Sequence, residues 1–240
     1  MIKPMGLPPL MVVTFDLLPG FFGAFDVMYE RDFLRPLFKL SPELRSIKRY
    51  QTYDLQNGRD AAGPFWTFYE LDSEITLNAT DEIFAKPEFA NHLAIFRTFK
   101  DTALFDFKRV NYEPIYNFTR RSGSIAGNGP AGGFRWIEKF DLAPERRDRF
   151  LEWYLGQYQE EIQECTPDYA SYHIFQVFGS TPGSVLSVFQ AALPDDIAQS
   201  LELLRGKKLG LNSPQWQSYC EDGTVVNLEC TALSSFLTLP

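Results

Sequence analysis

The sequence predicts an α+β protein made of two tandem βαββαβ units. The first observation is an internal repeat, in which residues 15–53 align without a gap on residues 140–178 at an offset of 125. The second is that the repeated stretch runs through a strand, a helix and a second strand, so it is a complete folding unit rather than a solenoid module. The third is length, because a chain of 240 residues can bury two cores of about 110 residues each.

Identical residues define the repeat. The segment Phe15-Asp16-Leu17 aligns with Phe140-Asp141-Leu142. Six more identities follow at the same offset: Pro19 with Pro144, Phe25 with Phe150, Tyr29 with Tyr154, Pro42 with Pro167, Ser46 with Ser171, and Gln51 with Gln176. The repeat predicts a first unit at 1–121, a linker at 122–133 and a second unit at 134–240.

The elements of the first unit follow from periodicity. Residues 10–16 are apolar and partly β-branched, which predicts a strand, and apolar residues at helical spacing after residue 20 predict an amphipathic helix that ends at Ser41-Pro42. Residues 47–53 and 65–71 predict two strands joined by a hairpin loop. A helical region at about 73–85, a short element at 87–89 and a last strand at 105–116 complete the unit.

The second unit repeats this order. Strands are predicted at 134–142, 169–178, 185–193 and 224–236, and helices at 144–163 and from 195 to about 205. In the Gly-rich linker, Gly127, Gly129 and Gly132 formally match a dinucleotide-binding fingerprint. We reject the match because the fingerprint needs a strand before it and a helix after it, whereas Pro130 lies inside it and a strand follows.

Composition excludes several classes of partner. A net charge of −8 and a pI near 4.9 argue against nucleic acid and against an anionic membrane surface. The three cysteines have no disulfide or metal pattern, and prolines interrupt the N-terminal apolar run, so a cytoplasmic protein is expected. The aromatic content of 15% suits either a tight core or a pocket for a small hydrophobic molecule.

The pairs Met28-Tyr29 and Trp153-Tyr154, with Arg49-Tyr50 on the following strand, resemble the dimeric α/β-barrel (ferredoxin-like) superfamily and its EthD-like members. The resemblance implies that the two units form an intrachain dimeric α/β barrel, a fused pseudo-dimer, with a homodimer of chains as a candidate assembly. It also implies that each unit can hold a small hydrophobic substrate between its sheet and its helices. Four residues after the tyrosine, that family often has histidine, where this chain has Phe33 and Tyr158.

Three residues of the second unit are candidate catalytic groups. His173 lies in a predicted strand, and its unperturbed pKa of about 6.5 suits a proton shuttle, with Glu138 or a tyrosine as its predicted partner. Glu138 alternates with Trp136 along a strand, so we expect a raised pKa and a role as acid or base, with Tyr158 as a further donor. The alternatives are a structural or surface histidine, and a Glu138 that pairs with Arg or Lys.

Aromatic and basic residues are candidate substrate contacts, with simple core packing as the alternative for the tyrosines. They are Tyr154, Trp136, Tyr29, Arg49 and Tyr69. Because titratable groups accumulate in the second unit, with Glu138 at the position of Val13 and His173 at that of Lys48, any working pocket is expected there.

Three functions are compatible with these residues. The first is a cofactor-independent enzyme, a lyase, cyclase, decarboxylase or isomerase, that does acid/base chemistry on an aromatic or polyketide-like molecule. The second is a non-catalytic binding or structural protein. The third is a haem enzyme similar to chlorite dismutases, which are also tandem barrels, with His173 as axial ligand. No metal, nucleophile or phosphate-loop motif is present, so neither a metal nor a cofactor is expected.

Overall fold

The computed structural model describes residues 6–120, 133–179 and 183–239, which divide into two compact units. The N-terminal unit contains residues 8–52, 60–113 and 235–239, and the C-terminal unit contains 6–7, 53–59 and the described residues of 114–234. Apart from Gly133, the predicted linker at 122–133, with its rejected glycine fingerprint, lies outside the described residues.

The N-terminal unit has the predicted βαββαβ order. Its elements are β1 (Leu10–Leu17), α1 (Phe22–Val27), the π-helix η1 (Met28–Leu34), α2 (Arg35–Leu40), β2 (Leu44–Asp54), β3 (Arg59–Leu71), α3 (Glu74–Asn78), α4 (Thr80–Phe84), the 3-10 helix η2 (Pro87–Phe89), α5 (Ala90–Ala103) and β4 (Leu104–Thr119). Two details differ from the prediction. The helical region at 73–85 is two short helices, and α5, a helix of 14 residues, follows η2 where no helix was predicted.

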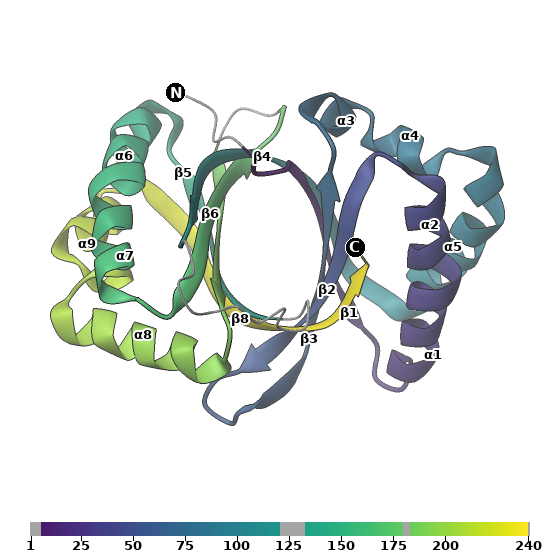
Figure 1. Cartoon of the computed structure of the whole chain (residues 1–240), viewed down its shortest axis with the longest axis horizontal. Coiled ribbons are helices and arrows are strands. Elements are labelled where there is room, and N and C mark those ends of the chain that lie inside the picture. Colours follow the sequence, from purple (N-terminus) through teal and green to yellow (C-terminus); the bar gives the residue numbers. More distant parts are fainter. Residues whose placement is uncertain (1–5, 121–132, 180–182, 240) are drawn as a thin grey trace. The chain divides into compact units, whose positions relative to one another are not determined.

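The sheet of the N-terminal unit is antiparallel, with strand order β4-β1-β3-β2. Val13 in the centre of β1 lies opposite Thr67 on β3 and Arg109 on β4. Directly opposed residues share a face of a sheet. The hydroxyl of Tyr29 on η1 reaches Thr67, which identifies this face as the one that the helices α1, α2 and α5 cover (Figure 1).

The C-terminal unit repeats the order, which confirms the α+β class and the two βαββαβ units. Its elements are β5 (Phe134–Leu142), the 3-10 helix η3 (Pro144–Arg146), α6 (Arg147–Trp153), the π-helix η4 (Tyr154–Tyr158), α7 (Gln159–Cys165), β6 (Tyr169–Val177), β7 (Ser184–Ala191), α8 (Pro194–Lys207), the 3-10 helix η5 (Gly210–Asn212), α9 (Pro214–Glu221) and β8 (Val225–Leu239). Its strand order is β6-β7-β5-β8.

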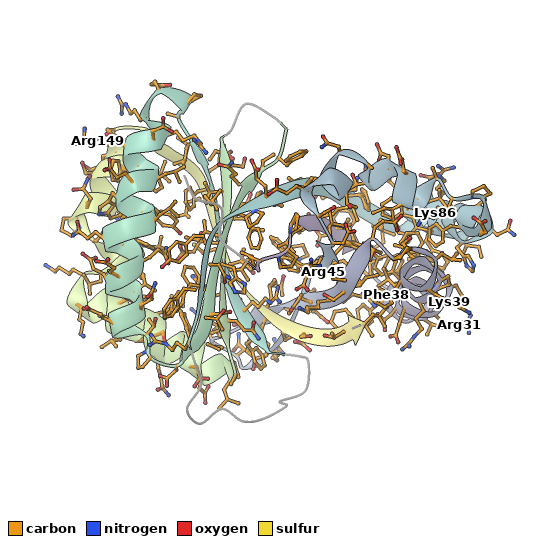
Figure 2. All side chains as sticks on the ribbon, turned by 45° about the horizontal axis from the view of Figure 1, so that its top comes forward. Arg31, Phe38, Lys39, Arg45, Lys86 and Arg149 are labelled. Carbon is orange, nitrogen blue, oxygen red and sulfur yellow. The ribbon has the colours of Figure 1, made fainter. Side chains whose placement is uncertain are left out.

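The layer between helices and sheet in the C-terminal unit is filled with aromatic side chains (Figure 2). Trp216 on α9 lies at its centre, 1% exposed. The Trp216 ring centroid is 5.4 Å from that of Phe140 on β5 and 5.5 Å from that of Tyr158 on η4. Such contacts give this unit a dense core.

A π-helix occurs at the same place in both units. Tyr29 lies in η1 and its repeat counterpart Tyr154 lies in η4. Short π-helical segments inside longer helices occur often at functional sites, so both tyrosines are candidate site residues. In the part of the chain that the structure describes, no helix has the length and apolar character needed to cross a membrane.

Candidate functional site

A cavity of about 570 Å³ lies on the helical side of the N-terminal unit. Its volume falls within the range of small-molecule sites, about 300–1,000 Å³. The cavity draws on β1, η1, β3, α4, α5 and β4, so most of the unit contributes to it. Its lining residues are Val13, Tyr29, Phe33, Tyr69, Asp81, Phe84, Ala85, Leu93, Phe96, Arg97, Lys100, Phe107 and Arg109.

Aromatic rings form much of the cavity wall. The Phe33 ring centroid is 4.4 Å from that of Phe96 on α5 and 5.3 Å from that of Tyr29 one turn earlier on η1. Rings in mutual contact have few rotatable bonds and hold a fixed shape. The wall is therefore suited to a flat, apolar ligand.

A pair of buried hydroxyl groups supplies the polar feature of this wall. The Tyr29 and Tyr69 oxygens are 2.9 Å apart, and the Tyr29 hydroxyl also reaches Oγ1 of Thr67 at 3.4 Å. Burial raises the pKa of Tyr29 and raises that of Tyr69 well above its usual value. Both groups keep their protons at neutral pH, so they act as hydrogen-bond donors rather than as bases.

Arg49 supports the tyrosine pair from β2. Its side chain is 1% exposed, its Nη1 donates to Asp26 Oδ1 at 2.6 Å, and its guanidinium lies 4.9 Å from the Tyr29 ring centroid. Arg49 is not part of the cavity lining. Its positive charge favours negative charge near both hydroxyls and opposes the effect of burial on their pKa values.

Glu138 occupies the corresponding region of the C-terminal unit. The side chain is buried and accepts hydrogen bonds from Trp136 Nε1 at 3.2 Å, Tyr158 at 3.2 Å and Tyr154 at 3.3 Å. Tyr154 also lies 2.8 Å from Oγ of Ser187. These contacts bring together four of the predicted site residues, and Glu138 lies on the same face as Trp136, as strand alternation predicted.

The pKa of Glu138 is raised to about 7, as its sequence environment predicted. Burial raises the pKa, and the three hydrogen bonds from Trp136, Tyr158 and Tyr154 lower it in part, because they favour the carboxylate. No Arg or Lys is among these partners. The group therefore titrates near neutral pH.

Glu138→Gln is expected to flatten the pH dependence of stability. The pKa of Glu138 is about 7 in the folded protein, against the ordinary value of 4.5 that applies to the unfolded chain. The stabilisation by the protonated acid is therefore complete below about pH 4.5 and is lost as pH rises through 7. The free energy of unfolding changes by about 3 kcal/mol over this range. Glutamine does not titrate. Denaturant unfolding at pH 5 and pH 8, followed by tryptophan fluorescence, measures the difference.

The control for this variant is Glu152→Gln, which changes an exposed carboxylate on α6. Three of the four tryptophans lie in the C-terminal unit, so fluorescence reports mainly on that unit. Parallel pH profiles for wild type and Glu138→Gln would show that Glu138 is already ionised well below pH 7.

A second cavity, beside Glu138 in the C-terminal unit, is far smaller than the N-terminal cavity. It measures about 10 Å³ and is lined by Glu138, Trp136, Tyr169, Phe189 and three aliphatic side chains. That is room for about one water molecule. A working pocket was expected in the second unit, but the larger of these two cavities lies in the N-terminal unit, so the expectation is wrong for that cavity. In the C-terminal unit, Trp216 and its neighbouring rings fill the layer between helices and sheet.

The strand register separates His173 from Glu138. His173 on β6 lies opposite Val188 on β7, whereas Glu138 on β5 lies opposite Ser187. Adjacent residues of a strand point to opposite faces, so the two side chains lie on opposite faces of the sheet. The predicted partnership of His173 with Glu138 is therefore corrected, and His173 is part of neither cavity lining.

Neither described cavity lining includes a histidine, so neither offers His173 as the axial ligand that the haem hypothesis requires. The second histidine, His92 on α5, has its Nδ1 2.7 Å from the backbone oxygen of Asp32. Within the described ranges, no three His, Cys, Asp or Glu side chains are grouped as metal ligands.

Sequence reasoning missed the lining residues that follow residue 80. They are Asp81, Phe84, Ala85, Leu93, Phe96, Arg97, Lys100, Phe107 and Arg109. The available signal was the spacing of Leu93, Phe96, Arg97 and Lys100 at i, i+3, i+4 and i+7, which places all four on one face of a helix.

Comparison with known proteins shows which solved structures have the same fold as this chain. No protein-family model matches the chain, and no curated protein sequence matches it. A solved structure described as an anthrone oxidase-like protein is similar over 99% of this chain and 95% of its own, with a TM-score of 0.65 and 13% identity. At that identity the likeness shows the fold alone.

Two further structures have the same fold. A candidate monooxygenase from Fusobacterium nucleatum matches 98% of this chain and 95% of its own, with a TM-score of 0.61 and 9% identity. A chlorite dismutase from Candidatus Nitrospira defluvii matches 98% and 93%, with a TM-score of 0.54 and 8% identity. All three structures share the fold of this chain over nearly its whole length.

Proposed function

We propose that the protein is a cofactor-independent enzyme that does acid/base chemistry on a small aromatic molecule bound in the N-terminal cavity. The observation that carries the proposal is the buried Tyr29–Tyr69 hydroxyl pair in the wall of an aromatic cavity of about 570 Å³. Membership of the EthD-like group, as a fused pseudo-dimer, belongs to the same proposal.

Tyr69 is the proposed donor to the substrate. Either oxygen of the pair can be the donor. In the orientation in which Tyr29 gives its single hydroxyl hydrogen to Tyr69 instead of Thr67, the Tyr69 O–H is left to bind an oxygen atom of the ligand. A neutral donor fixed by packing stabilises negative charge that develops on such an oxygen. The buried guanidinium of Arg49 adds a fixed positive charge behind the pair.

This arrangement suits proton removal from a carbon that a carbonyl group activates, either directly or through an aromatic ring. The C–H electron pair moves towards the carbonyl oxygen, which becomes an enolate hydrogen-bonded to Tyr69. The proton passes to water or to Asp81, the one carboxylate among the described lining residues. Asp81 forms an ion pair with Arg109.

Anthrone is a suitable first probe, because it is a flat aromatic ketone with an acidic methylene group and appears in the description of a similar structure. The protein is expected to accelerate deuterium exchange at that methylene carbon in D2O, measured by mass spectrometry. Ala85→Trp, which places an indole in the cavity lining, is expected to abolish the acceleration. Ala94→Trp, on α5 outside the lining, is the control.

A non-catalytic binding protein is the second candidate, favoured by one observation. Asp81 is largely exposed and paired with Arg109, so the described lining holds no free base. Aromatic probes that bind and are displaced by Ala85→Trp, without exchange or conversion of any of them, would favour this candidate over the enzyme.

A further inference from the structure

We propose that the ligand of the N-terminal cavity is an aromatic anion, and that Arg97 and Lys100 of α5 bind its negative group. This inference rests on the proposed function for the location of the site, and it adds the charge of the ligand. The observation behind it is that the lining combines aromatic side chains with three cations and one carboxylate.

The helix α5 presents both kinds of side chain on one face. Phe96 is buried, whereas Arg97 and Lys100, one and four positions later, are exposed, and all three line the cavity. Counted from Leu93, which also lines the cavity, Phe96, Arg97 and Lys100 follow at i+3, i+4 and i+7, a spacing that puts them on one face of the helix. The aromatic wall therefore continues directly into a cationic rim.

The two cations of α5 have no acidic partner. Among the described residues, neither Arg97 nor Lys100 makes an ion pair or a hydrogen bond. Lys100 makes a cation–π contact, with its Nζ 4.6 Å from the Phe107 ring centroid. Arg109, the third cation of the lining, is paired with Asp81. A ligand anion would thus meet two unpaired positive charges.

The excess of positive charge in the cavity lining contrasts with the negative charge of the whole chain. The chain carries a net charge of −8, so its surface as a whole repels anions. A cleft with low-dielectric walls concentrates the field of the charges that line it. Unpaired cations beside aromatic rings are therefore placed where they select a ligand that has both an apolar plane and a negative group.

Two probes of the same shape separate charge from shape. 2-Naphthoate carries a carboxylate, and 2-naphthamide carries a neutral amide on the same ring system. At low ionic strength, naphthoate is expected to bind roughly tenfold more tightly than naphthamide, and added salt is expected to remove most of the difference. Titration calorimetry on the full chain measures both affinities.

Charge-removing variants locate the effect. Arg97→Gln and Lys100→Gln are each expected to weaken naphthoate binding about two- to fivefold, with little change for naphthamide. Asp81→Asn is expected to strengthen naphthoate binding, because it frees Arg109 from its partner. Lys39→Gln is the matched control, because Lys39 is an exposed lysine of α2 outside the cavity lining (Figure 2).

The outcomes keep this inference separate from the proposed function. Equal affinity for the two probes, or a Lys39→Gln effect as large as that of Lys100→Gln, would overturn the inference. If both probes then still lost binding in Ala85→Trp, the aromatic site would stand without charge selection. If neither probe bound the wild-type protein, the site itself, and with it the proposed function, would be rejected.

Discussion

Tyr69→Phe is expected to lower kcat on the substrate of the N-terminal cavity by about 10²–10³-fold, with little change in KM. The ring stays and only the hydroxyl is lost, so the shape of the wall is preserved. The Tyr29 hydroxyl keeps Thr67 as a partner, and the cost in folding free energy is expected to be about 1 kcal/mol. Steady-state kinetics and thermal unfolding of the same samples measure the two effects.

The control for Tyr69→Phe is Tyr172→Phe in the C-terminal unit. Tyr172 is also fully buried, and its hydroxyl donates to the backbone oxygen of Thr166 at 2.9 Å. This variant loses a buried hydroxyl of the same kind but is expected to keep its kcat. Equal losses of activity in both variants would indicate a general effect of destabilisation rather than a donor at Tyr69.

Trp216→Ala is expected to lower the free energy of unfolding of the C-terminal unit by about 3–5 kcal/mol. The indole is almost fully buried and contacts rings from β5, α6 and η4. Its removal leaves a cavity that fixed neighbours cannot fill. Denaturant unfolding followed by near-UV circular dichroism measures the change.

Phe84→Ala provides the comparison in the N-terminal unit. Phe84 is only partly buried and already borders the cavity, so truncation is expected to cost less than half as much as Trp216→Ala. The contrast tests whether one unit is hollow and the other packed. Equal costs would contradict that description.

The repeat made the order of elements predictable from the sequence. Identities such as Phe25 with Phe150 and Tyr29 with Tyr154 fix the core-facing side of the first helix in each unit. The burial of Glu138 was predictable for a similar local reason, because strand alternation puts it on the same face as Trp136. Both inferences need only the periodicity of one element.

The relation of His173 to Glu138 was not predictable in this way. It depends on the register of β6 and β5 against β7, and a shift of one residue moves a side chain to the other face. The register of β6 against β7 also shifts between Tyr169 and Ser171. No local pattern in the sequence encodes such a shift.

The location of the cavity was missed because it depends on packing between distant segments. Phe33 in place of a histidine suggested a unit without a working site, but the same residue forms a wall of the larger cavity. The adjoining wall comes from α5, a segment to which the sequence analysis assigned no element. The register places Phe189 of the C-terminal unit where the N-terminal unit has Tyr69, so the proposed donor is special to the hollow unit.

The location of a bound aromatic ligand tests the central claim most directly. A crystal structure of the full chain with 2-naphthoate is predicted to show the naphthalene ring against Phe33 and Phe96, beside the hydroxyl of Tyr69, with its carboxylate near Arg97 and Lys100. Electron density for the ligand beside Glu138, or anywhere outside the N-terminal cavity, with that cavity empty, would contradict the account.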